Sequence, residues 1–116
     1  MRPRRSGTND DQEKLRTIKT TALYGHPADP RAFEDYYARV HMPLVAKMSG
    51  VVRSEASRVV GTPSGEKAPY YRIFEFWFES TEHMQAAFGS KEGQAVMADV
   101  PNFATGGLTV VISDVD

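Results

Sequence analysis

The segment from Tyr70 to Glu79 is a β-rich run in which aromatic residues recur. Successive side chains of a strand point to opposite faces, so one face of this strand carries three phenylalanines, Phe74, Phe76 and Phe78. The opposite face carries Tyr71, Ile73, Glu75 and Trp77. Because both faces are largely apolar, the strand needs cover on both sides, which places it inside a layered fold.

A first strand and a long helix precede this segment. Residues 18–24 alternate in a β-branched pattern typical of a strand. Asp29 and Pro30 predict a helix start, because the carboxylate accepts from free backbone N–H groups and proline forfeits no hydrogen bond at the first helical position. An apolar stripe predicts the buried face of this helix: Phe33, Tyr37, Val40, Leu44 and Met48. Pro43 removes an N–H donor inside the pattern, so we expect the helix to kink or restart at residues 41–43.

The remaining segments complete a split pattern of strands and helices. Residues 51–60 and 70–79 read as a hairpin joined by a loop rich in turn residues. Ser80 and Ser90 can cap two successive helical pieces, and residues 108–112 form a last strand. The order β-α-β-β-α-β predicts an α+β, ferredoxin-like fold, with a four-stranded antiparallel sheet and helices on one face.

The first residues differ in composition from the rest. Residues 1–14 carry four basic and three acidic side chains and no apolar side chain after Met1. Such a segment buries too little apolar surface to offset its ordering entropy. We therefore expect a flexible tail over residues 1–14 and one domain over residues 15–116.

The uncovered face of the sheet predicts an assembly. Two helices cover only one face, which leaves an apolar face on the order of 300 Å². Covering this face is worth on the order of 8 kcal/mol per subunit before association costs. We expect a homodimer in which two sheets pair through this face into a dimeric α/β barrel. The alternative is a monomer with Tyr71 and Trp77 on a wet sheet.

Composition excludes several classes of protein. Fourteen basic and fifteen acidic residues give a net charge of -1, which provides no broad surface for nucleic acid. Cysteine is absent, no apolar run is long enough to cross a membrane, and no signal-peptide core follows Arg5, so we expect a soluble cytoplasmic protein. The three histidines lack metal-ligand spacing, Gly61 to Lys67 fails the phosphate-loop pattern, and no GxGxxG motif occurs. We expect no metal and no tightly bound cofactor.

Two residues are candidates for catalysis. His41 lies at the Pro43 break, where backbone groups are freed, and imidazole transfers protons near neutral pH. Its alternative role is structural, as a hydrogen-bond partner of a carbonyl released by Pro43. Glu75 lies between apolar residues on the face assigned to the barrel interior, where it could act as an acid or base. Its alternative role is an ion pair with Arg53.

Four aromatic residues are candidates for substrate binding. Trp77 and Tyr71 offer a flat wall to a planar substrate, although both also suit an interface core. Tyr24, at the end of the first strand, could hold a carbonyl or phenol by its hydroxyl. Phe103 could close a mouth of the barrel, although packing against the helices is its alternative role.

Four motifs in order around these elements resemble one family. They are Ala38-Arg39-Val40-His41-Met42-Pro43-Leu44, Phe76-Trp77-Phe78-Glu79-Ser80, Ser90-Lys91-Glu92-Gly93-Gln94-Ala95 and Asn102-Phe103-Ala104-Thr105-Gly106-Gly107. Together they resemble the EthD family of the dimeric α+β barrel superfamily. The resemblance implies a ferredoxin-like subunit whose sheet pairs with that of its mate, and His41 matches the family's histidine. Barrel relatives include cofactor-free monooxygenases, polyketide cyclases, lactone isomerases and haem enzymes, and fold alone does not choose among them.

Two functions remain open at this point. The first is a small oxidoreductase-type or isomerase-type enzyme with His41 as acid/base, Glu75 as its partner, and an apolar or aromatic substrate in the barrel cavity. The second is a non-catalytic accessory protein that carries a hydrophobic ligand for an oxygenase system. A cavity that contains both His41 and Glu75 would favour the enzyme.

Overall fold

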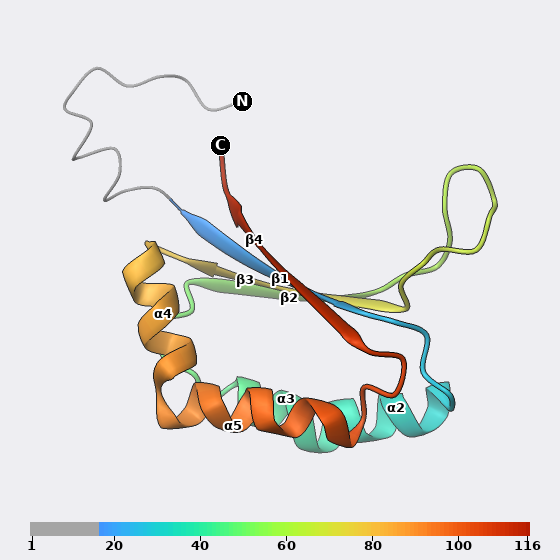
Figure 1. The fold of residues 1–116 in the computed structure, drawn as a ribbon, viewed down its shortest axis with the longest axis horizontal. Coiled ribbons are helices and arrows are strands. Elements are labelled where there is room, and N and C mark those ends of the chain that lie inside the picture. The colour runs from blue at the N-terminus through green and yellow to red at the C-terminus, as the bar shows by residue number, and fades with distance from the viewer. Residues whose placement is uncertain (1–16) are drawn as a thin grey trace.

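A computed structural model describes residues 17–116 as one sheet covered by helices on one side (Figure 1). The elements are β1 (Ile18–Tyr24), α2 (Pro30–Tyr36), the π-helical segment η1 (Tyr37–His41), α3 (Met42–Val45), β2 (Arg53–Arg58), β3 (Arg72–Phe78), α4 (Thr81–Gly89), α5 (Lys91–Asp99), the 3-10 segment η2 (Val100–Asn102) and β4 (Leu108–Asp114). The strand order is β2-β3-β1-β4, and every neighbouring pair is antiparallel. The predicted ferredoxin-like fold is confirmed, while the predicted tail lies outside the described residues.

Polar side chains begin the helices at the predicted positions. The Asp29 carboxylate accepts from the backbone N–H of Ala32, with Pro30 as the first helical residue. Ser80 and Ser90 cap α4 and α5 in the same way. These caps satisfy backbone donors that a helix start leaves without partners.

The first helix widens where a kink or restart was expected. Around Pro43 the chain keeps helical dihedrals, but Tyr37 to His41 form a π turn in which the N–H of Met42 bonds the carbonyl of Tyr37. A π turn holds one more residue than an α turn, so it shifts the buried face by one position. The predicted stripe was therefore wrong at Val40, which is 38% exposed, and at Leu44, where His41 and Val45 are buried instead, while Met48 is buried as predicted. The observed buried positions are Phe33, Tyr37, His41, Val45 and Met48.

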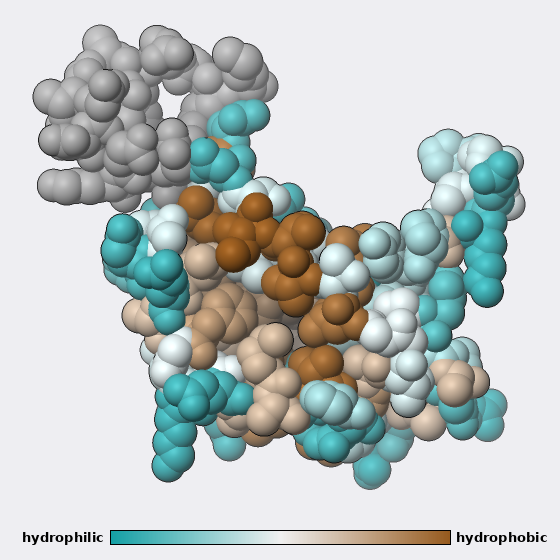
Figure 2. Space-filling view, viewed as in Figure 1, coloured by the Kyte–Doolittle hydropathy of each residue, from teal (hydrophilic) through white to brown (hydrophobic). Residues whose placement is uncertain are grey.

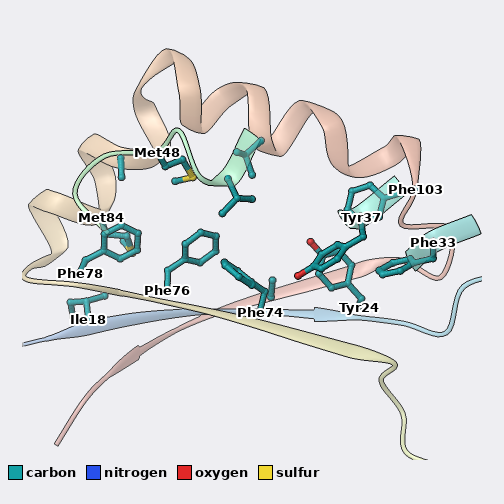
Figure 3. Close-up of a cluster of buried hydrophobic side chains, with 14 residues drawn as sticks. Ile18, Tyr24, Phe33, Tyr37, Met48, Phe74, Phe76, Phe78, Met84 and Phe103 are labelled. Carbon is teal, nitrogen blue, oxygen red and sulfur yellow. The ribbon is translucent and has the colours of Figure 1, made fainter. Parts of the chain in front are cut away.

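The core lies between the helices and one face of the sheet. Phe74, Phe76 and Phe78 point toward the helices and are at most 5% exposed, as the alternation predicted. Near the N-terminal end of β3, Tyr24 and Tyr37 lie among further aromatic side chains (Figure 3). The helix layer and this sheet face thus enclose an aromatic interior.

The other sheet face has no covering element among residues 17–116 (Figure 1). Its side chains form cross-strand rows: Lys19, Trp77 and Arg53 in one, Thr21, Glu75 and Glu55 in the next, and Leu23, Ile73 and Ser57 in the third. We call this surface the open face. It carries a basic row, an acidic row and an apolar row in sequence.

Candidate active site

A small cavity lies between the helices and the sheet, on the side opposite the open face. Its free volume is about 30 Å³, room for little more than a water molecule. The walls are mainly apolar, and the lining residues are Thr20, Ala22, Tyr24, Tyr37, His41, Met42, Val45, Phe74, Phe76, Phe88, Val96, Met97, Val100, Leu108 and Val110. Met97 and Val110 at its edge are 43% and 44% exposed. Hydrophobic side chains gather along β4 and beside α5 on this side of the molecule (Figure 2).

His41 reaches the cavity wall because of the π turn. Its side chain is 2% exposed, and its Nδ1 lies 2.9 Å from Oδ2 of Asp99, the last residue of α5. The Phe103 ring packs on the imidazole, with centroids 4.5 Å apart. The expected carbonyl near Pro43 is not the partner that the structure gives to His41. An Nδ1–H that donates to Asp99 leaves the lone pair of Nε2 as the free basic site of the imidazole.

Asp99 is itself held in place by two other donors. The Tyr36 hydroxyl donates to Oδ1 across 2.5 Å, and the Asn102 side-chain amide donates to the same atom across 3.0 Å. Three donors thus converge on one carboxylate that is 8% exposed. Such an arrangement fixes the orientation and tautomer of the histidine, as partner carboxylates do in acid–base sites.

The pKa values of this pair follow from its surroundings. Burial lowers the pKa of His41, and the neighbouring Asp99 carboxylate acts in the opposite direction without cancelling it. Burial alone would raise the pKa of Asp99, but hydrogen bonds from Tyr36, His41 and Asn102 bring it below its ordinary value. At neutral pH the site therefore holds an ionised Asp99 beside a neutral His41 whose Nε2 can accept a proton.

Two buried hydroxyls on the cavity wall have no acceptor for their proton among the described residues. They are Oγ1 of Thr20 and Oη of Tyr37, in side chains that are 3% and 4% exposed. Burial raises the pKa of Tyr37 to about 12, against the charge of Arg72 and a side-chain hydrogen bond from it. Because a guanidinium only donates, the Tyr37 hydroxyl keeps its own proton and can still donate it. Tyr24 also lines the cavity, which settles that it faces the helices, and burial raises its pKa as well.

Glu75 lies on the opposite side of the sheet from His41. It belongs to the open face, because its neighbours Phe74 and Phe76 point into the helix-side core. The prediction that Glu75 partners His41 is therefore wrong in its geometry. The predicted ion pair with Arg53 is also wrong: Glu75 lies 3.1 Å from Nζ of Lys19.

The other predicted binding residues divide between the two sides. Trp77 lies on the open face as expected, where the Arg53 guanidinium stacks over its ring at 4.4 Å. Tyr71 does not lie there, because it precedes β3 and packs edge-on against Phe33 of α2, with its hydroxyl donating to Glu34. Of the predicted binding residues, only Tyr24 lines the cavity.

Phe103 packs against the helices and His41, as its alternative role predicted, and is 4% exposed. Sequence reasoning missed Asp99. One signal was present: an acidic residue at a helix C-terminus opposes the helix dipole, so it needs a donor from elsewhere in the fold.

Residues 17–116 lack two further features. In that part of the chain no three acidic or histidine side chains cluster closely enough to hold a metal ion. None of its helices is long and apolar enough to span a membrane.

Comparisons with known proteins place the chain in a family. The EthD domain matches residues 25–107. The chain belongs to the EthD family. An uncharacterized 11.0 kDa protein from the thcB-thcC intergenic region of Rhodococcus erythropolis is 40% identical over 96 residues, which cover 83% of this chain and 92% of that protein.

Solved structures agree with this assignment. An EthD family protein from Bacillus halodurans is similar with a TM-score of 0.81 and 34% identity, over 86% of this chain and 99% of that one. A protein of unknown function from Thermobifida fusca, described as a dimeric ferredoxin-like protein, has a TM-score of 0.66 at 12% identity, over 86% and 92% of the two chains. The second likeness supports the fold alone.

Proposed function

We propose that this EthD family member is a small enzyme that takes an apolar or aromatic molecule into the helix-side cavity and uses His41 as its acid/base. The observation that carries the proposal is the His41–Asp99 pair at the wall of an apolar cavity, 2.9 Å from Nδ1 to Oδ2. An imidazole on a protein surface needs no such support, whereas a proton-transferring one gains from a fixed tautomer and a carboxylate that stabilises its charged form.

The chemistry of this arrangement is proton transfer. His41 is neutral at pH 7 because burial lowers its pKa, so Nε2 can accept a proton from a ligand in the cavity. The Asp99 carboxylate stabilises the imidazolium that forms, and the His41 imidazolium returns the proton to the ligand in a later step. Isomerisation needs no more than this, and oxidative chemistry can begin from the carbanion or enolate that proton removal leaves.

Ligand entry requires the cavity to widen. A free volume of about 30 Å³ is far below the roughly 300 Å³ or more of a typical small-molecule site. Two methionines line it, Met42 and Met97, and unbranched thioether side chains change shape at low cost. Met97 lies at the exposed edge, so its displacement opens the cavity toward solvent.

The test compares wild type with His41→Asn on a panel of phenols, lactones and aromatic polyketide-like acids. Binding is followed by thermal shift and conversion by mass spectrometry. We expect both proteins to be stabilised by the same ligands and only wild type to convert one of them. The control His83→Asn, at an exposed position on α4, should retain conversion.

The competing function is a ligand carrier, which the largely apolar wall of the cavity favours. Binding by wild type without conversion of any ligand would support the carrier. Normal conversion by a folded His41→Asn protein would contradict the acid/base role directly.

We further propose that two copies pair through the open face. Among residues 17–116 no element covers this face, and its basic row lies next to its acidic row. A second copy related by a two-fold axis can set the acidic row of one sheet against the basic row of the other. The similar Thermobifida fusca structure is described as dimeric, which agrees with this arrangement.

A further inference from the structure

Two hydroxyls of the cavity that lack an acceptor indicate which chemical group its ligand contains. A buried hydroxyl without a hydrogen bond costs roughly 1–3 kcal/mol, so proteins rarely keep one without a use. Here two hydroxyls without an acceptor, Thr20 Oγ1 and Tyr37 Oη, belong to residues that line the same cavity and are more than nine-tenths buried.

The surroundings of Tyr37 make it a good donor. The Arg72 guanidinium lies over its ring at 4.6 Å and is itself held by Glu34, with Nη2 to Oε1 at 2.6 Å. A cation against the ring polarises the phenol, while burial keeps the hydroxyl protonated. In Figure 3 the Tyr37 side chain points from the helix layer into the interior near Phe74.

His41 stands beside this donor. The Tyr37 and His41 rings are stacked, with centroids 6.0 Å apart, and both line the cavity. Thr20 also lines this cavity, so the two hydroxyls and the imidazole belong to one binding space, and we expect a ligand in it to reach all three groups. Apart from Tyr24, the rest of the wall is apolar and offers a ligand no further hydrogen-bonding side chain.

We propose that the ligand is an apolar carbonyl compound with an acidic hydrogen on the adjacent carbon, that Tyr37 and Thr20 bind its oxygen, and that His41 removes that hydrogen. This inference rests on the proposed acid/base function and names its substrate class. The C–H bond breaks, its proton forms an N–H bond at Nε2, and the electron pair becomes the C=C bond of an enolate. The negative charge resides on the oxygen that Tyr37 and Thr20 hydrogen-bond. Where the ligand carries a C=C bond conjugated with the enolate, return of the proton to the far carbon of that bond completes an isomerisation without an oxidant or reductant.

The first experiment measures binding of a matched pair of probes to the full chain by NMR titration. The probes are cyclohexanone and methylcyclohexane, which are similar in shape and differ in the carbonyl oxygen. We expect cyclohexanone to bind about 5- to 10-fold more tightly, as one or two neutral hydrogen bonds supply. The double variant Tyr37→Phe with Thr20→Val should lose this preference.

Control variants keep this experiment decisive. Tyr70→Phe removes a hydroxyl outside the cavity and should leave the preference unchanged. If the double variant does not fold, Tyr37→Phe alone takes its place in the experiment. It keeps the aromatic ring and should lose most of the preference for cyclohexanone. Equal binding of the two probes by wild type, or a preference that survives Tyr37→Phe and Thr20→Val, would overturn the oxygen subsite and leave a purely apolar or water-filled cavity.

The second experiment separates this inference from the proposed function. Cyclohexanone in D₂O is followed by NMR for deuterium incorporation at the carbons beside the carbonyl. We expect wild type to accelerate the exchange at least about 100-fold over His41→Asn, which is the low end of the effect of a positioned base. If the ketone preference depends on Tyr37 but exchange is equal in wild type and His41→Asn, the acid/base role is overturned while the oxygen subsite stands.

Discussion

Nδ1 of His41 and Oδ2 of Asp99 lie 2.9 Å apart, although 58 residues separate them in the chain. The π turn brings His41 to the buried face of the first helix, and the last turn of α5 brings the carboxylate opposite it. The hydrogen bond thus ties the two helical segments together beside the cavity. In the proposed function it contributes to both stability and proton transfer, and these two contributions can be measured separately.

Replacing the carboxylate tests the pair from the Asp99 side. Asp99→Asn keeps the shape but removes the charge that opposes the effect of burial on His41, so the pKa of His41 should fall further. NMR titration of the imidazole measures this shift. Because three side chains donate hydrogen bonds to the buried Asp99 carboxylate, we expect Asp99→Asn to lower the free energy of unfolding by about 1–3 kcal/mol in chemical denaturation. The exposed ion pair of Asp35 with Arg39 offers the matched control, and Asp35→Asn should cost less than about 0.5 kcal/mol.

Acidification should destabilise the fold in two stages. The folded-state pKa of His41 lies below its ordinary value, so the unfolded chain takes up a proton first as the pH falls through about 6.5. Stability is thus full above this pH and is lost below it. The pKa of Asp99 is also lower in the folded protein, so a further loss of stability follows below about pH 4 for the same reason. Melting temperatures measured from pH 8 to pH 3 check both stages, and His41→Asn should remove the upper stage and reduce the lower one, since His41 helps to lower the pKa of Asp99. A wild-type curve that is flat between pH 7 and pH 5 would contradict the assignment of a buried neutral His41.

The sequence predicted those parts of the fold that depend on local chemistry. Asp29, Ser80 and Ser90 cap helices because capping needs only the neighbouring backbone. The three phenylalanines of β3 were assigned to the buried face by alternation alone. The topology followed from the order of these elements.

The site was harder to predict, since it depends on contacts between distant residues. The apolar stripe was predicted with an average spacing near 3.6 residues per turn. The π turn adds one residue, so the buried position after Tyr37 is His41 and not Val40. Tyr71 was assigned by extending strand alternation one residue beyond the start of β3, where it no longer holds. Asp99 lay in a helix whose packing partner was unknown until the fold was complete.

Close backbone contact between two glycines should make one of them intolerant of a side chain. A Cβ on Gly25 would lie 2.2 Å from the carbonyl oxygen of Gly106, where the end of β1 meets the loop before β4. The contact is with backbone and cannot be relieved by a rotamer change, so Gly25→Ala should cost about 2–4 kcal/mol in chemical denaturation. Gly61 has open space around its Cβ position and no positive φ, so Gly61→Ala should change stability by less than about 1 kcal/mol. Equal effects of the two substitutions would show that this approach is looser than the structure places it.

If two open faces pair, a charge introduced in the apolar row should disrupt the dimer most. Ile73 lies there between Leu23 and Ser57, so Ile73→Glu would bury a carboxylate between two sheets without a basic partner in its own row. Gln85→Glu adds the same charge at an exposed position on α4. Size-exclusion chromatography with light scattering at micromolar concentration should give a dimer for wild type and Gln85→Glu, and a folded monomer for Ile73→Glu. A monomeric wild type would remove the proposed dimer, while the helix-side cavity would keep its acid–base groups, because every residue assigned to it lies on the other face of the sheet.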